Sequence, residues 1–179
     1  MREPRIVLAL PGDPGGAEAW APVLAALNED SSLRVQVRAR LVGWPVLEAV
    51  GLRCAELDVE REASGAWAAA EGLLDEARPD LLLTGSCFDP GVELAAERTA
   101  RRRGIPVLSL LDSWTHYRRG FRMPGEQELD VYGVPDVIGV MDDLARDEMV
   151  AEGFPEDRLR VVGHPGLDLF LQAQREMDG

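Results

Sequence analysis

The sequence predicts an α/β protein: a single Rossmann-like domain with about seven mostly parallel strands and helices on both faces of the sheet. Two observations lead to this prediction. The segments 6–10 and 80–84 are short and almost wholly apolar, which is typical of strands buried on both faces of a parallel sheet. They alternate with longer segments whose apolar residues recur at helical spacing, and such alternation is typical of consecutive β-α-β units.

The other elements are predicted in the same alternation. Segment 33–42 alternates apolar and polar residues, as in a half-covered strand near a sheet edge. Segments 62–77 and 90–103 are predicted helices that end at the stop signals Pro79 and Gly104. Segment 112–133 is too long for an ordinary connection and is expected to be functional or mobile. Further strands are expected at 52–57, 106–111, 136–141 and 159–162, and further helices at 17–27, 43–50, 144–152 and 167–177.

Composition and charge narrow the classes of function. The 179 residues fit one domain, and the net charge is -13, with 32 acidic residues, 19 arginines and no lysine. An acidic surface repels phosphate groups, so we expect neither nucleic acid nor an anionic membrane surface as a partner. Two cysteines without a Cys-x-x-Cys pair or a Cys/His cluster predict no disulfide framework and no metal site. The short apolar run near the N-terminus predicts no signal peptide and no membrane span, so the cytoplasm is expected.

Ligands of open parallel sheets bind beyond the carboxyl ends of the strands. Here those ends are followed by segments 12–16, 85–89, 112–122, 141–143 and 163–168. The first segment is rich in glycine, and Gly12, Gly15 and Gly16 are predicted to let the backbone approach a substrate closely. The pattern is neither Gly-x-Gly-x-x-Gly nor a Walker A loop, and arginines stand where a ribose-binding acid would end the second strand. The sequence therefore predicts no NAD and no other bound cofactor.

Two carboxylates beside this loop are the candidate catalytic residues. Asp13 lies within the loop and Glu18 just after it, and either could act as a general base if burial raised its pKa. The structural alternatives are turn formation for Asp13 and a favourable first-turn charge on a helix for Glu18. The sequence leaves both alternatives open.

Segment 112–122 is a second candidate region, because three arginines and three aromatic residues are concentrated there in an acidic chain. Arginine can bind phosphate or carboxylate, and aromatic rings can stack on a sugar or a base. The alternative is that the aromatic residues only cover the end of the sheet. The arginines at 98 and 101–103 are interpreted as cations that suit the C-terminal end of a helix. The predicted substrate-binding residues outside the glycine loop are Ser86, Asp112, Trp114, Tyr117, Arg118, Arg119 and His164.

Several motifs together resemble the N-terminal half of GT-B fold enzymes, the glycosyltransferases built from two Rossmann domains. Segment 7–27 (VLALPGDPGGAEAWAPVLAAL) is similar to the opening strand, acid-containing glycine loop and helix of lipid-A-disaccharide synthase. Segment 161–168 (VVGHPGLD) resembles the Val-Gly-His-Pro-x-x-Asp turn that precedes the second domain of that family. Arg78-Pro79-Asp80 and Gly104-Ile105-Pro106 also look like motifs of these enzymes and of the UDP-N-acetylglucosamine 2-epimerases. The family's second acid would match position 17, which is Ala17 here, so Glu18 is the candidate substitute.

The resemblance implies the acceptor-binding half of a GT-B-type glycosyltransferase of carbohydrate biosynthesis, which transfers a hexosyl group from a nucleotide sugar. On this interpretation residues 1–168 form the Rossmann-like domain and 169–179 a terminal helix or hinge remnant. The partners would be a small-molecule sugar or nucleotide sugar and a second, donor-binding domain or subunit. Two alternatives stay open. One is a non-catalytic nucleotide- or sugar-phosphate-binding protein. The other is a small hydrolase or transferase that uses Ser86, Asp89, Asp112 and His164.

Overall fold

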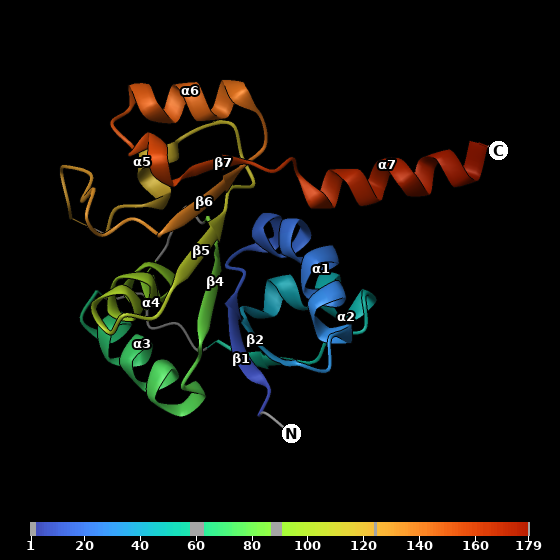
Figure 1. Ribbon diagram of the computed structural model, residues 1–179, viewed down its shortest axis with the longest axis horizontal. Helices are drawn as coiled ribbons and strands as arrows, with labels where there is room; N and C mark the ends of the chain where they lie inside the picture. Colours follow the sequence, from blue (N-terminus) through green and yellow to red (C-terminus); the bar gives the residue numbers. More distant parts are fainter. Residues whose placement is uncertain (1–2, 58–62, 87–90, 124, 179) are drawn as a thin grey trace.

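A seven-stranded sheet forms the centre of the computed structural model, which describes residues 3–57, 63–86, 91–123 and 125–178. The strand order is β3-β2-β1-β4-β5-β6-β7, and every neighbouring pair is parallel, which confirms the predicted fold class (Figure 1). The strands are β1 (Arg5–Leu10), β2 (Leu33–Ala39), β3 (Cys54–Glu56), β4 (Leu81–Gly85), β5 (Val107–Leu110), β6 (Val137–Val140) and β7 (Leu159–Val161).

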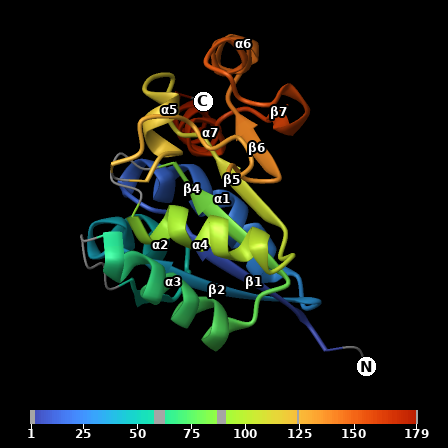
Figure 2. The same cartoon turned by 90° about the vertical axis from the view of Figure 1, so that its left-hand side faces the viewer.

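Helices cover both faces of this sheet. Helices α1 and α2 lie on one face, and α3 and α4 lie on the other, as Figures 1 and 2 show. The helices are α1 (Pro14–Glu29), α2 (Trp44–Ala49), α3 (Ala63–Ala77), α4 (Gly91–Arg102), α5 (Tyr117–Gly120), α6 (Asp143–Ala151) and α7 (Pro165–Asp178). Single 3-10 turns at Leu41–Gly43 and Glu156–Arg158 precede α2 and β7.

The apolar run of β1 has a simple physical cause in this arrangement. Successive side chains of a strand point to opposite faces of the sheet. Leu8 and Leu10 pack into the core under α3 and α4, while Val7 and Ala9 pack into the core under α1. A strand covered on both faces therefore needs apolar residues at every position.

Two helices begin earlier than the sequence predicts, because side chains cap them. Helix α1 begins at Pro14, where the Asp13 side chain accepts a hydrogen bond from the Gly16 N–H. Helix α7 begins at Pro165, and Nδ1 of His164 accepts a hydrogen bond from the Leu167 N–H. The expected boundary between the Rossmann-like domain and the terminal segment, at residue 168, therefore lies in the first turn of α7.

Strand β2 shows the alternation that the sequence indicates, with Val37 and Ala39 buried and Arg34 exposed. It lies near the edge of the sheet, as predicted, with β3 as the edge strand on its outer side. It also ends at Ala39 rather than at residue 42, since the next residues turn into the 3-10 segment before α2.

The long segment 112–133 is tied down rather than extended into solvent. It contains the short helix α5, and Tyr117 and Phe121 are buried in a third core cluster with Met149 and Phe154. The rings of Phe121 and Phe154 pack edge to face, with their centroids 5.3 Å apart. The aromatic residues Tyr117 and Phe121 therefore do cover the sheet end, which was the structural alternative for this region.

The arginines at the end of α4 fasten the same segment. Arg98 forms a bidentate ion pair with Glu126 at 2.6 and 2.7 Å. Arg101 pairs with Asp136 and donates to the backbone carbonyl of Val134. A cation at a helix C-terminus suits the macrodipole, but here these guanidinium groups also hold the path of the chain between β5 and β6.

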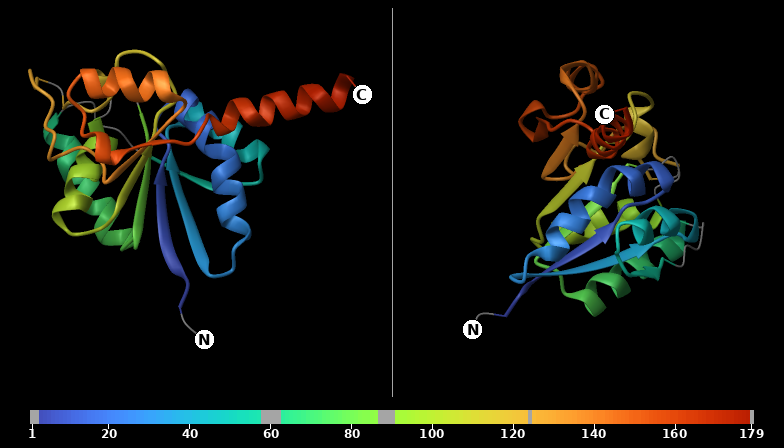
Figure 3. Two further views of the ribbon diagram at one scale, coloured as in Figure 1. Left: turned by 45° about the horizontal axis from the view of Figure 1, so that its top comes forward. Right: turned by 90° about the vertical axis from the view of Figure 1, so that its right-hand side faces the viewer.

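Helix α7 leaves the body of the domain after β7. Its first turn packs on α1, where Gly166 lies so close to the Glu18 carbonyl that a Cβ would come 2.6 Å from that oxygen. Beyond this contact the helix projects away from the sheet, as Figures 1 and 3 show. Several of its apolar side chains are exposed, and Phe170 is the most exposed of them at 64%.

Candidate functional site

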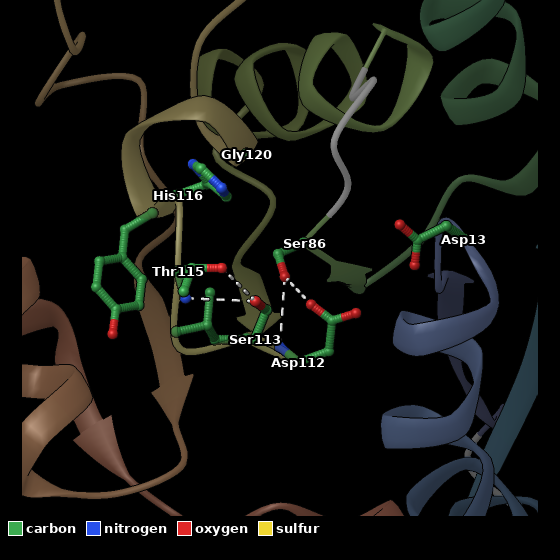
Figure 4. Close-up of a pocket in the computed structure, with 9 residues that line it drawn as sticks. Asp13, Ser86, Asp112, Ser113, Thr115, His116 and Gly120 are labelled. Carbon is green, nitrogen blue, oxygen red and sulfur yellow. Dashed lines mark hydrogen bonds between the residues drawn. The ribbon is translucent and has the colours of Figure 1, made fainter.

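The site lies where β1, β4 and β5 end, at the centre of the sheet. The loops that follow these three strands carry Asp13, Ser86 and Asp112 to one open hollow (Figure 4). The strand-end rule used on the sequence therefore selected side chains that come together. The described residues that line the hollow are Asp13, Ser86, Leu111, Asp112, Ser113, Thr115, His116, Tyr117 and Gly120.

Glycines let these loops pack closely. Gly12 has a φ of +82°, a left-handed conformation that turns the chain from β1 toward α1. A Cβ on Gly16 or on Gly85 would collide with the carbonyl oxygen of Pro11. A Cβ on Gly15 would overlap the Asp112 carboxylate. The glycine loop therefore packs against the other strand ends, in addition to any contact with a ligand.

Asp112 and Ser86 form a tight polar pair in the middle of the hollow. The Ser86 hydroxyl donates to Oδ1 of Asp112 at 2.5 Å, and the Asp112 N–H donates to Ser86 Oγ at 3.3 Å. Burial raises the pKa of Asp112, and the charge of Asp13 raises it further. The Ser86 hydrogen bond and the nearby His164 partly oppose this rise in the pKa. A carboxylate with a raised pKa is a stronger proton acceptor than an ordinary carboxylate, as a general base requires.

Asp13 faces this pair from the N-terminus of α1, as Figure 4 shows. Its Oδ1 accepts the hydrogen bond of the Gly16 N–H at 3.1 Å. Its turn-forming role is therefore present, and its carboxylate also lines the hollow.

Glu18 is not brought to the same place. Its side chain is exposed on α1 and is absent from the described lining of the hollow. Ala17, at the position of the expected family acid, is fully buried in the core.

Trp114 and His164 form a second pair at the rim. Their rings stack with centroids 6.3 Å apart and planes 14° from parallel. Trp114 Nε1 donates to Oδ2 of Asp142 at 2.8 Å, and Asp142 also caps α6 through Ala145. These two hydrogen bonds keep the pKa of Asp142 below its usual value. The pair thus links the start of α6 to the start of α7.

The arginines of segment 112–122 are not among the described residues that line the hollow. The backbone N–H of Arg118 donates to Glu152, and its guanidinium group lies near Gly153 at the end of α6. Arg119 is exposed. Neither belongs to the described lining of the hollow. Tyr117 contributes its buried ring to the wall, while its hydroxyl donates to Glu148 at 2.6 Å.

Several lining residues were not selected from the sequence. Ser113 and Thr115 supply hydroxyl groups that are hydrogen-bonded to each other at 3.2 Å. His116 adopts a φ of 60°, which is uncommon for a residue other than glycine. All three belong to segment 112–122, for which the prediction rested on the arginines and the aromatic residues. Asp142 lies in segment 141–143, which the sequence predicts to follow a strand end, but its contact with Trp114 is visible only in three dimensions.

No family model matches the sequence, and no curated protein matches it significantly. Solved structures do match the fold. The UDP-GlcNAc 2-epimerase of Neisseria meningitidis, bound to UDP-GlcNAc, has a TM-score of 0.70 at 16% identity over 97% of this chain and 50% of its own. The glycosyltransferase of kitacinnamycin has a TM-score of 0.60 at 16% identity, over 92% of this chain and 52% of its own. MurG of Acinetobacter baumannii has a TM-score of 0.61 at 16% identity, over 90% of this chain and 45% of its own.

These likenesses define the class of fold. The chain has the Rossmann-like architecture found in GT-B epimerases and glycosyltransferases, and it spans about half the length of each of these proteins. Among the described residues, no helix combines the length and apolarity needed to cross a bilayer. The same residues contain no group of three or more His, Cys, Asp or Glu side chains placed to hold a metal ion.

Proposed function

We propose that this chain is the acceptor-binding half of a GT-B-type glycosyltransferase, which acts with a second Rossmann-like domain or subunit that holds the nucleotide-sugar donor. The observation that carries the proposal is the convergence of Asp13 and the Ser86–Asp112 pair in an open hollow at the central strand ends. The likeness to one half of nucleotide-sugar enzymes supports it.

The chemistry would proceed through the carboxyl groups. An acceptor hydroxyl binds in the hollow, with the hydroxyls of Ser113 and Thr115 within its polar wall. Asp112 takes the proton from that hydroxyl, because burial raises its pKa and so strengthens it as a proton acceptor. The acceptor oxygen then forms a bond to the anomeric carbon, and the bond from that carbon to the donor phosphate breaks. The nucleoside diphosphate leaves with the electron pair.

A transfer assay tests this proposal. A lysate from source cells that lack the gene is supplied with the purified chain and with labelled nucleotide sugars. We expect the chain to restore transfer of label to a product, and Asp112→Asn to restore about a hundredfold less. Asn keeps an oxygen that can accept the Ser86 hydrogen bond but cannot take the proton.

Asp75→Asn is the matched control for the assay. Asp75 lies on α3, at the other end of the molecule from the hollow. The substitution removes its carboxylate from an exposed ion pair with Arg103. Restoration by Asp112→Asn equal to that by Asp75→Asn would contradict the proposed role. Thermal melts of both variants show whether each is folded.

The two alternatives find less support in the geometry. A nucleotide- or sugar-phosphate-binding protein needs cations in its site, and Arg118 and Arg119 do not line the hollow among the described residues. The common serine-hydrolase arrangement needs a histidine beside the serine, but the Ser86 hydroxyl donates to the carboxylate of Asp112 instead, and Nδ1 of His164 accepts from the Leu167 N–H. Asp89 lies outside the described residues.

A further inference from the structure

We infer that the hollow selects a sugar or polyol that carries a free amino group and rejects its phosphorylated counterpart. This inference names the acceptor class and therefore rests on the proposed function. It follows from the charges that the hollow presents, which differ from those of a phosphate site.

The described lining is acidic and hydroxyl-rich. It contains two carboxylates, Asp13 and Asp112, and three hydroxyl side chains, Ser86, Ser113 and Thr115, but no arginine. The whole chain has no lysine, so arginine and histidine are its only cationic side chains. Of the lining residues, only His116 could add positive charge.

Two arginines that follow strands of the sheet make contacts outside the described lining of the hollow. Arg118 lies at the end of α6, near Gly153. Arg40, at the end of β2, pairs through two hydrogen bonds with the buried Glu93. A phosphate placed in the hollow would therefore meet carboxylates, in a protein whose net charge is already -13.

The carboxylates of Asp13 and Asp112 both lie close to Gly15. The position of a Cβ on this glycine lies 3.5 Å from Oδ1 of Asp13 and overlaps Oδ2 of Asp112. Oδ1 of Asp112 is already bonded to Ser86, which leaves Oδ2 as the oxygen without that hydrogen bond. An ammonium group has three N–H donors, so it can bind both carboxylates at once.

The N-terminus of α1 could be expected to attract an anion instead. The Asp13 carboxylate already takes that role, since it accepts the Gly16 N–H at the start of the helix. Its charge raises the pKa of the neighbouring Asp112, which indicates repulsion between the two groups. A cation between them relieves this repulsion, whereas a further anion increases it.

A titration of the intact chain with four probes tests the inference. The probes are glucose, glucosamine, 6-amino-6-deoxyglucose and glucose 6-phosphate, followed by chemical-shift changes in 1H–15N NMR spectra at constant pH and ionic strength. We expect at least one amino sugar to bind about tenfold more tightly than glucose, because a charge-assisted hydrogen bond replaces a neutral one. We expect glucose 6-phosphate to shift no resonance of segments 12–16 or 112–117.

Variants assign the preference to the carboxylates. Asp13→Asn and Asp112→Asn should each bring the affinity for the amino sugar close to that for glucose, while Asp75→Asn should leave the difference unchanged. Equal affinity for glucose and both amino sugars, tightest binding of glucose 6-phosphate, or no shift with any probe would overturn the inference. The transfer assay is independent of this titration: selective amino-sugar binding without restored transfer would refute the proposed function and leave the ligand class standing.

Discussion

Gly16→Ala and Gly85→Ala are each expected to lower the free energy of unfolding by about 3 kcal/mol or more. At both positions a Cβ would collide with the carbonyl oxygen of Pro11, and its distance to the Pro11 carbonyl carbon would be 3.2 Å for Gly16 and 2.9 Å for Gly85. Backbone atoms cannot rotate away as a flexible side chain can. Relief therefore requires the Pro11 carbonyl group to move away from the start of α1 for Gly16→Ala, or from the end of β4 for Gly85→Ala, and either shift also disturbs the hollow.

Urea denaturation followed by circular dichroism measures this loss. Gly72→Ala is the matched control, because Gly72 lies inside α3 and has no atom within 4 Å of the position of its Cβ. Alanine at an unobstructed helical position should stabilise the protein by about 0.5–1 kcal/mol. Similar unfolding free energies for Gly16→Ala, Gly85→Ala and the wild type would show that the loop adapts without cost.

Glu97→Gln is expected to change how stability depends on pH. Glu97 is buried in α4, and one oxygen accepts the Thr84 hydroxyl hydrogen bond at 2.6 Å. Burial raises the pKa of Glu97 to about 8, and the charge of Glu93 adds to this rise. Between its ordinary pKa of 4.5 and about 8, the folded chain therefore holds a proton that the unfolded chain has lost. Stability contributed by this group is present at acid pH and falls as pH rises across that window.

The expected slope is at most about 1.4 kcal/mol per pH unit for one proton. Glutamine keeps the acceptor oxygen for Thr84 but does not titrate, so the variant should lack this slope. It should equal the wild type most closely near pH 5 and exceed it near pH 8.

Denaturation at several pH values gives the free energy of unfolding of the wild type and of Glu97→Gln. In the difference between these two free energies, the contributions of titrating groups that both proteins share cancel. Glu71→Gln removes one carboxylate from an exposed position of α3 and controls for the change in net charge. Parallel pH profiles for the wild type and Glu97→Gln would contradict the protonated, buried state of Glu97.

The site was predictable where strand ends alone determine it. Asp13, Ser86 and Asp112 each follow a buried strand, and parallel neighbours bring their carboxyl ends to one edge. Arg118 and Arg119 also follow a strand, but their direction depends on α5. Tyr117 and Phe121 are four residues apart and so share one face of the chain there, which is buried against α6. That packing accompanies the position of Arg118 at the end of α6, and neither arginine is among the described residues that line the hollow. Nothing in the local sequence specifies this packing.

The sequence by itself predicted a Rossmann-like α/β protein, from its apolar runs and strand-helix alternation, and the Gly12–Gly16 loop indicated a ligand side after the first strand. Apolar runs, Pro and Gly stops and strand-helix alternation are local properties, so they can be deduced without coordinates. Tertiary structure alone decided that Gly16 and Gly85 pack on Pro11, that Asp112 rather than Glu18 joins Asp13, and that the hollow contains no arginine among its described residues. The contacts of Gly85 with Pro11 and of Gly15 with Asp112 join segments that are far apart in the sequence, so no local pattern specifies them. The burial that raises the pKa of Asp112 likewise exists only in the folded chain.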